Sequence, residues 1–368
     1  MSTALKDKYS SAFYDNFSNA VKEVIPSFSK KKFITSIFDE TWDSKELKDR
    51  MRHTSFVLHQ FLPEDFETAA GKIEKIITKL RQSSFPDGGI EFLFFPDYIE
   101  RYGINHFDIS VKAIEFTTQY ITCEYAVRPF IIMYGDRMMQ QMHAWSLHEN
   151  HHVRRLASEG SRPRLPWAVA LPSLKKDPGP VLPLLNNLKT DPSEYVRRSV
   201  ANSLNDIAKD NPDIVLSIAK QWKGISRETD AIIKHGCRTL LKQGNATVLK
   251  YFGLNAGEDI KLSAFTIINR SLHIGEALSF SFSLKNEGRK IQAIRLEYGI
   301  YYLRQNGLLS KKVFKISEKS LQPGEQVKIL RKQSFRIITT RKFYPGKHKL
   351  SIIINGRELK AGHFELFD

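Results

Sequence analysis

The sequence predicts two domains of different class, an all-α solenoid of helical repeats at residues 1–253 and an all-β sandwich at residues 257–368. Three observations lead to this prediction. Apolar residues recur at helical spacing up to about residue 252, they alternate with polar residues from residue 257 on, and one helical motif is repeated within the first part. A chain of 368 residues is long enough to bury a core in each domain.

In the first domain, apolar stripes at helical spacing include those at residues 13–24 and 73–80. Segments that contain proline, at 83–89, 162–166 and 175–180, fall where helices should end, and the first and third also contain glycine. This part of the chain therefore predicts a series of short helices separated by turns.

Three segments of the first domain repeat one another. They start at residues 151, 194 and 231, and they share an apolar position at Val153, Val196 and Ile233. Each is expected to begin a helix, after a turn with one of three residues near its start: Asn150, Pro192 or Asp230. Each has a partner helix upstream, and antiparallel helix pairs that repeat at about 40 residues are typical of HEAT-like solenoids.

Basic residues follow the shared apolar position in every repeat: Arg154, Arg155, Arg197, Arg198, Lys234 and His235. On the concave face of a solenoid, such residues from successive helices would form a groove that matches the phosphates of a nucleic-acid duplex. The alternative is that these side chains form ion pairs with neighbouring repeats.

The second domain alternates apolar and polar residues with a period of two. The clearest strands are expected at 278–288, 294–304, 326–337 and 348–356, with turn sequences between them. About seven short strands in roughly 110 residues are typical of an immunoglobulin-like sandwich.

The chain is strongly basic, with a formal net charge of +16. Residues 257–368 hold 21 Lys and Arg against 10 Asp and Glu, so that most of the excess lies in the second domain. Such a charge indicates an anionic partner, with nucleic acid first and an acidic membrane surface second. The alternative is a basic surface that only confers solubility.

Several classes of function are disfavoured. No apolar run is long enough for a transmembrane helix, and the N-terminus lacks the apolar core of a signal peptide. Cys123 and Cys237 alone form neither a disulfide framework nor a four-thiolate zinc site. His148, His151 and His152 do not form a zinc motif, and there is no Walker or dinucleotide-binding motif. We expect a cytoplasmic protein without metal or cofactor.

Carboxylates stand out inside the basic helical repeats, since acids repel a phosphate ligand. Glu159 and Asp206 follow the shared valines by about two and three helical turns and so fall toward one face. Glu124 is expected to end the helix before the first repeat, and Trp167 follows a proline segment that can hold the indole out of the core. Carboxylates beside an aromatic ring suit cleavage of an N-glycosidic bond, which builds positive charge on the sugar.

Each of these residues also has a purely structural interpretation. Glu159 could be a surface acid that pairs with Arg155 or Arg162, Asp206 a residue of a helix surface, and Trp167 a buried wedge between repeats. The residues alone leave both interpretations open.

At these residues the sequence resembles the AlkC branch of the HEAT-like AlkC/AlkD DNA glycosylases. The resemblance covers residues 46–73, 97–131, 151–168 and 190–216, and it is most specific in "EYAVRPF" and "SEGSRPRLPWA". The order of domains also resembles this branch, in which some members carry a basic immunoglobulin-like domain after the repeats, although many members lack it.

The resemblance implies a monofunctional glycosylase that hydrolyses the N-glycosidic bond of cationic N3-methylated bases, such as 3-methyladenine and 3-methylcytosine, in duplex DNA. This activity belongs to base excision repair of alkylation damage. The resemblance assigns roles at the deoxyribose of the lesion to Glu124, Glu159, Trp167 and Asp206. It also implies that the damaged base need not be fully extruded, unlike the general rule for glycosylases.

Position and charge alone select four candidates for contacts to DNA phosphates: Arg155, Arg162, Arg164 and Arg198. A cationic base is a good leaving group and needs little acid catalysis, whereas a neutral lesion would demand a proton donor and a tight base pocket, and the sequence shows neither. We expect a monomer bound to duplex DNA in the nucleoid of a bacterium. The competing hypotheses are a non-catalytic scaffold that binds DNA or protein, and binding of the second domain to an anionic membrane.

Overall fold

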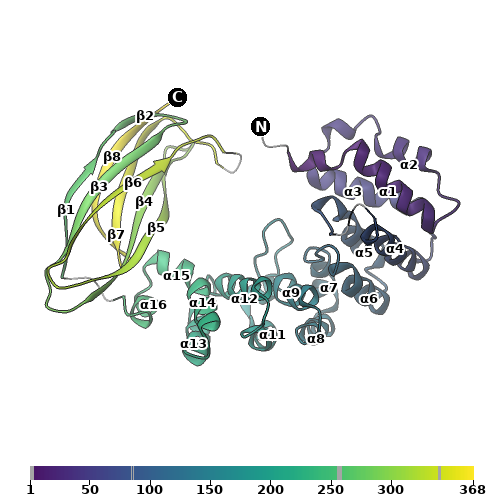
Figure 1. Cartoon of the computed structure of the whole chain (residues 1–368), viewed down its shortest axis with the longest axis horizontal. Coiled ribbons are helices and arrows are strands. Elements are labelled where there is room, and N and C mark those ends of the chain that lie inside the picture. Colours follow the sequence, from purple (N-terminus) through teal and green to yellow (C-terminus); the bar gives the residue numbers. More distant parts are fainter. Residues whose placement is uncertain (1–3, 84, 86, 255–258, 339–340) are drawn as a thin grey trace. The chain divides into compact units, whose positions relative to one another are not determined.

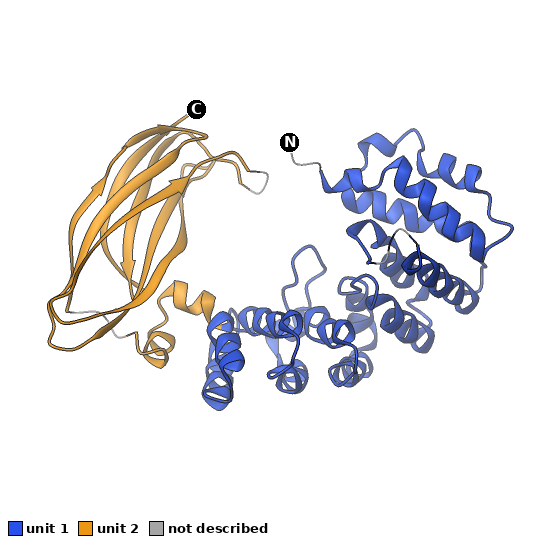
Figure 2. Cartoon of the chain, in the orientation of Figure 1, with its two compact units in different colours: residues 1–236 blue, residues 237–368 orange. Residues whose placement is uncertain are grey.

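The computed structural model describes residues 4–83, 85, 87–254, 259–338 and 341–368. The chain forms two compact units, Met1–Gly236 and Cys237–Asp368, which are coloured separately in Figure 2. The first unit is helical. The second contains two short helices and a β-sandwich.

The helices of the first unit are labelled in Figure 1 where space allows. They are α1 (Ser11–Val24), α2 (Lys30–Ile37), α3 (Leu47–His59), α4 (Phe66–Arg81), α5 (Phe94–Gly103), α6 (Phe107–Thr118), α7 (Val127–Tyr134), α8 (Asp136–Trp145), α9 (His151–Gly160), α10 (Pro172–Lys176), α11 (Leu182–Leu188), α12 (Glu194–Ile207), α13 (Pro212–Trp222) and α14 (Arg227–Gly236). Short 3-10 helices lie at Leu5–Lys8, Trp42–Ser44, Ile90–Phe92 and Gly179–Val181. In the described part of the chain, no helix is both long and apolar enough to cross a membrane.

Capping residues set where several of these helices begin. The side chain of Asp65 accepts a hydrogen bond from the backbone N–H of Thr68 at 2.8 Å, at the start of α4. Asn150 caps α9 in the same way, through the N–H of His152 at 2.8 Å. These side chains satisfy backbone donors that have no partner within the helix, and thereby fix its first residue.

The predicted repeats are helix pairs. α9, α12 and α14 pack on one another in sequence, and α8, α11 and α13 pack against them (Figure 1). The shared positions Val153, Val196 and Ile233 are buried between these helices. The predicted start of the third repeat is wrong, because α14 begins at Arg227 and already contains Asp230. The sequence Ser226–Thr229 caps it instead, since the Ser226 hydroxyl accepts from the N–H of Thr229 at 3.1 Å.

The second unit is a sandwich of two sheets. Its strands are β1 (Ile260–Ile267), β2 (Ser271–His273), β3 (Ala277–Asn286), β4 (Gln292–Leu303), β5 (Leu309–Leu321), β6 (Gln326–Ser334), β7 (Gly346–Ile354) and β8 (Arg357–Phe367). One sheet has the order β1-β3-β6 and the other β2-β8-β7-β4-β5, with neighbours antiparallel except β2 and β8. Every second residue of β3 from Leu278 to Leu284 is buried in the core between the sheets. The described residues thus form one strand more than the seven expected.

The two short helices α15 (Arg238–Gln243) and α16 (Ala246–Tyr251) belong to the second unit. The turn between them packs on the β7–β8 hairpin through two glycines, Gly244 and Gly356, both with positive φ. A Cβ on Gly356 would lie 2.5 Å from the Cα of Gly244. The compact units therefore divide after Gly236, whereas the predicted boundary at 253–257 follows the change from helices to strands.

Acidification is expected to destabilise the sandwich through His348. This side chain has no exposed surface, its Nδ1 accepts from the N–H of Leu303 at 3.2 Å, and its Nε2 donates to the carbonyl of Tyr344 at 3.0 Å. Burial lowers the pKa of His348 below its ordinary value of 6.5. Below pH 6.5 this histidine binds a proton in the unfolded chain but not in the folded protein. The free energy of unfolding therefore falls as the pH falls, by up to about 1.4 kcal/mol per pH unit.

Thermal unfolding of the full chain between pH 7.5 and pH 5 tests this. The midpoint is expected to drop on acidification, and the drop is expected to be smaller in His348→Gln, which cannot take up the proton. An identical pH dependence in both proteins would show that another group is responsible.

Candidate active site

Three of the four predicted catalytic residues lie close together in the first unit. Glu159 lies in the last turn of α9, Asp206 in the last turn of α12, and Glu124 in the turn before α7. Their side chains are 6%, 2% and 11% exposed, respectively, so solvent reaches Glu124 most. The expectation that Glu124 ends a helix is wrong, because α6 already ends at Thr118.

Two arginines alternate with the three carboxylates. Arg155 forms an ion pair with Glu124, and its Nη2 lies 3.6 Å from Oε1 of Glu159. Arg162 forms an ion pair with Glu159, and its Nη2 lies 2.8 Å from Oδ2 of Asp206. We call the series Glu124, Arg155, Glu159, Arg162 and Asp206 the carboxylate row. It links the turn before α7 to two successive repeats.

The electrostatics of the row favour the charged form of its two arginines. Burial would lower the pKa of Arg155, but the carboxylates of Glu124 and Glu159 outweigh it and raise the pKa above the ordinary value. Arg162 behaves in the same way, with Glu159 and Asp206 outweighing burial. The arginines also fix the direction of each carboxylate. Charges held in fixed positions with little water around them are what stabilisation of a developing positive charge requires.

A buried arginine of α7 fixes the connection that follows α9. Arg128 has no exposed surface, and its guanidinium donates to the carbonyls of Gly160 (2.8 Å), Arg162 (2.7 Å) and Val169 (2.5 Å). Burial and the neighbouring Arg162 lower the pKa of Arg128 to about 10, which leaves it cationic at neutral pH. Gly160 allows α7 and α9 to approach here, since a Cβ on it would lie 2.5 Å from Cγ1 of Val127.

This connection, residues 161–171, presents Trp167 to solvent. In Figure 1 it is the loop that projects from the helices beside the labels α9 and α12. Trp167 is 64% exposed, and its carbonyl accepts a hydrogen bond from Lys48 of α3. The prediction that the proline segment holds the indole out of the core is confirmed. The interpretation of Trp167 as a buried wedge between repeats is wrong.

The backbone of Trp167 is strained, with a φ of +65°. A side chain in this left-handed region costs about 1 kcal/mol, which glycine avoids. Trp167→Gly is therefore expected to have a free energy of unfolding about 1 kcal/mol higher than that of Trp167→Ala, although both lack the indole. Chemical denaturation of the two variants measures the difference. Equal stabilities would mean that residue 167 leaves the left-handed region once the indole is gone.

The structural interpretations of the two repeat carboxylates have different outcomes. Glu159 does pair with Arg155 and Arg162, as that interpretation proposed, but it is buried and is not a surface acid. Asp206 is not a residue of the helix surface, because it is buried and contacts both Arg162 and Lys209, the latter at 2.8 Å. Ion pairing and catalysis are compatible, since a paired carboxylate remains negative.

The four arginines proposed for DNA phosphates fall into two kinds. Arg155 and Arg162 are buried in the carboxylate row, so their guanidinium groups face carboxylates rather than the surface. Arg164 and Arg198 are more accessible, with side chains 37% and 67% exposed. They pair with Asp210 at 2.5 Å and with Glu194 at 2.8 Å. Exposed pairs of this kind contribute little free energy, so a phosphate can compete for these two arginines.

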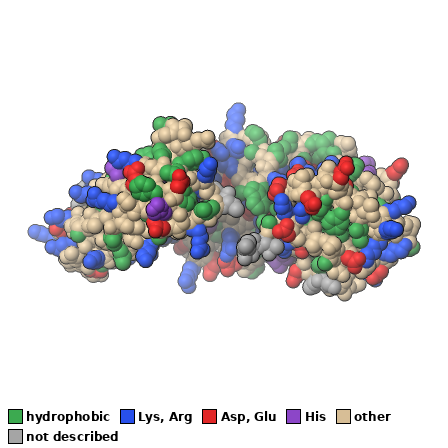
Figure 3. Space-filling view, turned by 90° about the horizontal axis from the view of Figure 1, so that it is seen from above, with side chains coloured by type: hydrophobic (Ala, Val, Ile, Leu, Met, Phe, Trp, Pro, Cys, Tyr) green, Lys and Arg blue, Asp and Glu red, His purple; other side chains and the backbone are tan. Residues whose placement is uncertain are grey.

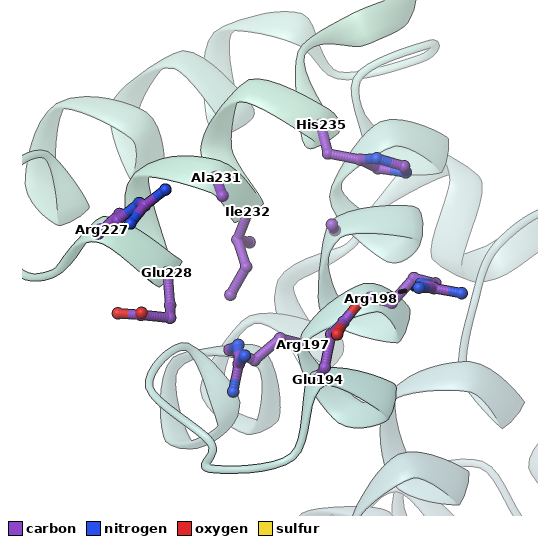
Figure 4. Close-up of a pocket in the computed structure, with 9 residues that line it drawn as sticks. Glu194, Arg197, Arg198, Arg227, Glu228, Ala231, Ile232 and His235 are labelled. Carbon is purple, nitrogen blue, oxygen red and sulfur yellow. Dashed lines mark hydrogen bonds and ion pairs between the residues drawn. The ribbon is translucent and has the colours of Figure 1, made fainter.

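Arg198 lines a hollow of about 320 Å³ between α12 and α14. Figure 4 shows it beside Glu194, with His235 on the facing helix. Arg197 also lines the hollow, but its guanidinium donates to the carbonyls of Asp191 (2.6 Å) and Pro192 (2.8 Å) before its own helix. Arg198 therefore presents a positive charge in the hollow, whereas the guanidinium of Arg197 is used to hold the start of α12.

Basic side chains also cover the second unit, as the face in Figure 3 shows. Lys312 of β5 and Lys328 and Lys332 of β6 are exposed, on the strands that form an edge of each sheet. Charged side chains on edge strands hinder unwanted pairing with another sheet, and they also offer contacts to an anionic partner.

Arg128 is the residue of the site to which the sequence assigned no role. The sequence does contain an indication of such a residue, because Arg128 is the one charged residue in the otherwise apolar segment "AVRPFII". A buried charge requires several partners, so such an arginine indicates a structural anchor.

No cluster of three or more potential His, Cys, Asp or Glu metal ligands occurs among the residues placed in the structure.

Comparisons with known proteins agree with this arrangement. Residues 261–368 match the family model described as "Uncharacterised protein YhaZ, C-terminal Ig-like domain". The uncharacterised protein YhaZ of Bacillus subtilis (strain 168) is 44% identical over 98% of this chain and 99% of its own. The structure of the Pseudomonas fluorescens alkylpurine DNA glycosylase AlkC, bound to DNA containing an abasic site analog, superposes with a TM-score of 0.93. It is 35% identical, and the match covers both chains completely.

Proposed function

Since the chain belongs to the AlkC branch of the HEAT-like repeat DNA glycosylases, we propose that it hydrolyses the N-glycosidic bond of cationic N3-methylated bases in duplex DNA. The substrates we propose are 3-methyladenine and 3-methylcytosine, in base excision repair of alkylation damage. The enzyme acts without a cofactor or metal, as a monomer in the cytoplasm, at the nucleoid of a bacterium.

The carboxylate row is the observation that carries this proposal. Three buried carboxylates lie together in the helical repeats of a basic protein, with an arginine between each pair. Ion pairs of this kind would also stabilise a scaffold that only bound DNA; we propose that this protein uses the carboxylates for catalysis as well. A cationic transition state would gain several kcal/mol from such fixed negative charge.

In the proposed reaction, the bond between C1′ and the base nitrogen breaks and its electron pair leaves with the base. The base thereby loses its positive charge, and the deoxyribose takes on oxocarbenium character. Glu159 and Asp206 stabilise that charge, and Glu124, the most exposed of the three, accepts a proton from the water that attacks C1′. Trp167 lies against the deoxyribose of the lesion.

The duplex is held mainly through its phosphates. Arg164 and Arg198 are the arginines that we propose for these contacts, because their exposed ion pairs yield readily. Lys312, Lys328 and Lys332 of the second unit add a further basic surface for the same duplex. In this account Arg155 and Arg162 are positioning residues for the carboxylates and do not contact phosphate.

A panel of lesions tests the proposal. Duplexes that contain 3-methyladenine, 3-methylcytosine, hypoxanthine or 8-oxoguanine are incubated with the full chain, and the released bases are measured by mass spectrometry. We expect release of the two cationic bases only, with intact abasic strands. Release of the neutral bases at similar rates would overturn the substrate assignment, and release of none above the spontaneous rate would overturn the function.

A further inference from the structure

A second concave site shares Trp167 with the catalytic region. It is a cavity of about 170 Å³, lined by α3, α5, the start of α7 and the 161–171 connection. Trp167 and Tyr125 supply aromatic surface, and Leu47, Met51 and Leu93 supply apolar surface. A cavity of about 150 Å³ accommodates a single benzene ring, so this one has the size for a small flat heterocycle.

The cavity is lined by equal numbers of acidic and basic side chains. Asp97 and Glu100 come from α5, and Lys48 and Arg52 come from α3. The ammonium group of Lys48 also donates a hydrogen bond to the carbonyl of Trp167. Because side chains of both signs line the cavity, neither a free anion nor a free cation would meet a uniformly attractive surface, which favours a neutral polar ligand.

Two polar atoms of the lining residues lack a hydrogen-bond partner among the described residues. They are the hydroxyl of Tyr9 and Oδ2 of Asp97. The nearest cation to that oxygen is Arg101, whose Nε lies 3.7 Å away, beyond hydrogen-bond length. Unsatisfied buried polar groups are rare in folded proteins and call for a functional explanation.

We propose that this cavity binds the free base released by the reaction, a neutral purine or pyrimidine with an amino group beside a ring nitrogen. Trp167 and Tyr125 provide the stacking surface for its ring. The carboxyl of Glu100 pairs with the amino group and the adjacent nitrogen through two hydrogen bonds, one in each direction. Burial, and then the charge of Asp97, raise the pKa of Glu100 to about 7, so at neutral pH about half of the molecules carry a protonated carboxyl, which both donates and accepts.

The proposal rests on the glycosylase function and adds to it a site for the product. Tyr125 follows the catalytic candidate Glu124 directly in the sequence, and Trp167 serves both sites. A base that leaves the deoxyribose beside Trp167 would enter a site that matches its hydrogen-bonding edge. The expectation that the chain lacks a base pocket and a proton donor would then hold only for the cleavage step.

Binding of free 3-methyladenine to the full chain, measured by isothermal titration calorimetry at pH 7, tests the proposal. We expect binding to the wild type, and affinity at least about tenfold lower in Glu100→Met, which keeps the length of the side chain but loses its hydrogen bonds. Met51→Trp, which fills the cavity, is expected to abolish binding. Glu67→Met, at an exposed position of α4, serves as the matched control, and purine, which lacks the amino group, as the control ligand.

No binding to the wild type, or equal affinity in Glu100→Met and Glu67→Met, would overturn the proposal. So would equal affinity for purine. Thermal unfolding of each variant shows whether it is folded. Base excision is measured on the same preparations, so that the two proposals are tested separately. Excision without binding of the free base would overturn only the product site. Binding of the free base without excision would overturn only the glycosylase function.

Discussion

Replacing Glu159 with glutamine is expected to slow base release by at least about 100-fold, the usual effect of removing one preorganised electrostatic group from an active site. Glu159 is the central carboxylate of the row and contacts both arginines. The amide keeps the shape but removes the charge that would stabilise the deoxyribose cation. Single-turnover release of 3-methyladenine from a methylated duplex gives the rate.

Two controls separate catalysis from folding and binding. Arg155 still pairs with Glu124, and Arg162 with Asp206, in Glu159→Gln, so we expect a folded protein that binds an abasic duplex as tightly as the wild type. Glu67→Gln, an exposed acid in the first turn of α4, is expected to retain the full rate. A Glu159→Gln rate within threefold of the wild type would rule out a catalytic role for this carboxylate.

Arg128→Met is expected to lower the free energy of unfolding by about 3 kcal/mol, because three carbonyl groups, two of them in buried hydrogen bonds, lose their charged donor. These carbonyls belong to Gly160, Arg162 and Val169, which lie on both sides of Trp167. The connection would lose its fixed shape, and excision is expected to fall together with stability. Urea denaturation and the single-turnover rate measure the two effects.

Arg101→Met is the matched control, since the Arg101 side chain is 41% exposed and its ion pair with Asp97 is long, with 3.7 Å between Nε and Oδ2. It is expected to change the free energy of unfolding by less than about 1 kcal/mol. Arg128→Lys would restore the charge but not the three donor directions, and therefore only part of the stability. Equal stability of Arg128→Met and the wild type would contradict the anchoring role.

Local patterns in the sequence predicted the two architectures. The buried valines of the repeats and the alternating residues of β3 reflect periods of a few residues, which are visible without knowledge of distant contacts. The exposure of Trp167 was predicted for the same reason, because prolines act on their immediate neighbours. The predicted start of α14 is wrong because Ser226 and Asp230 are about equally good N-cap residues, so that the sequence alone does not distinguish them.

The interactions of the site could not be predicted in the same way. Arg162 contacts Asp206 from another repeat, and positive charge alone does not indicate whether a guanidinium faces a phosphate or a carboxylate. Arg155 and Arg162 were therefore assigned to DNA when their partners are acids. The cavity beside Trp167 had no signal, because Glu100, Lys48 and Trp167 come from three distant segments.

The most direct test of the account is the release of 3-methyladenine from a methylated DNA duplex by the wild-type chain. We expect free base and an abasic site in an uncut strand, at a rate far above spontaneous loss. Tight binding of the same duplex without any release above the spontaneous rate would contradict it and would favour a non-catalytic DNA-binding scaffold.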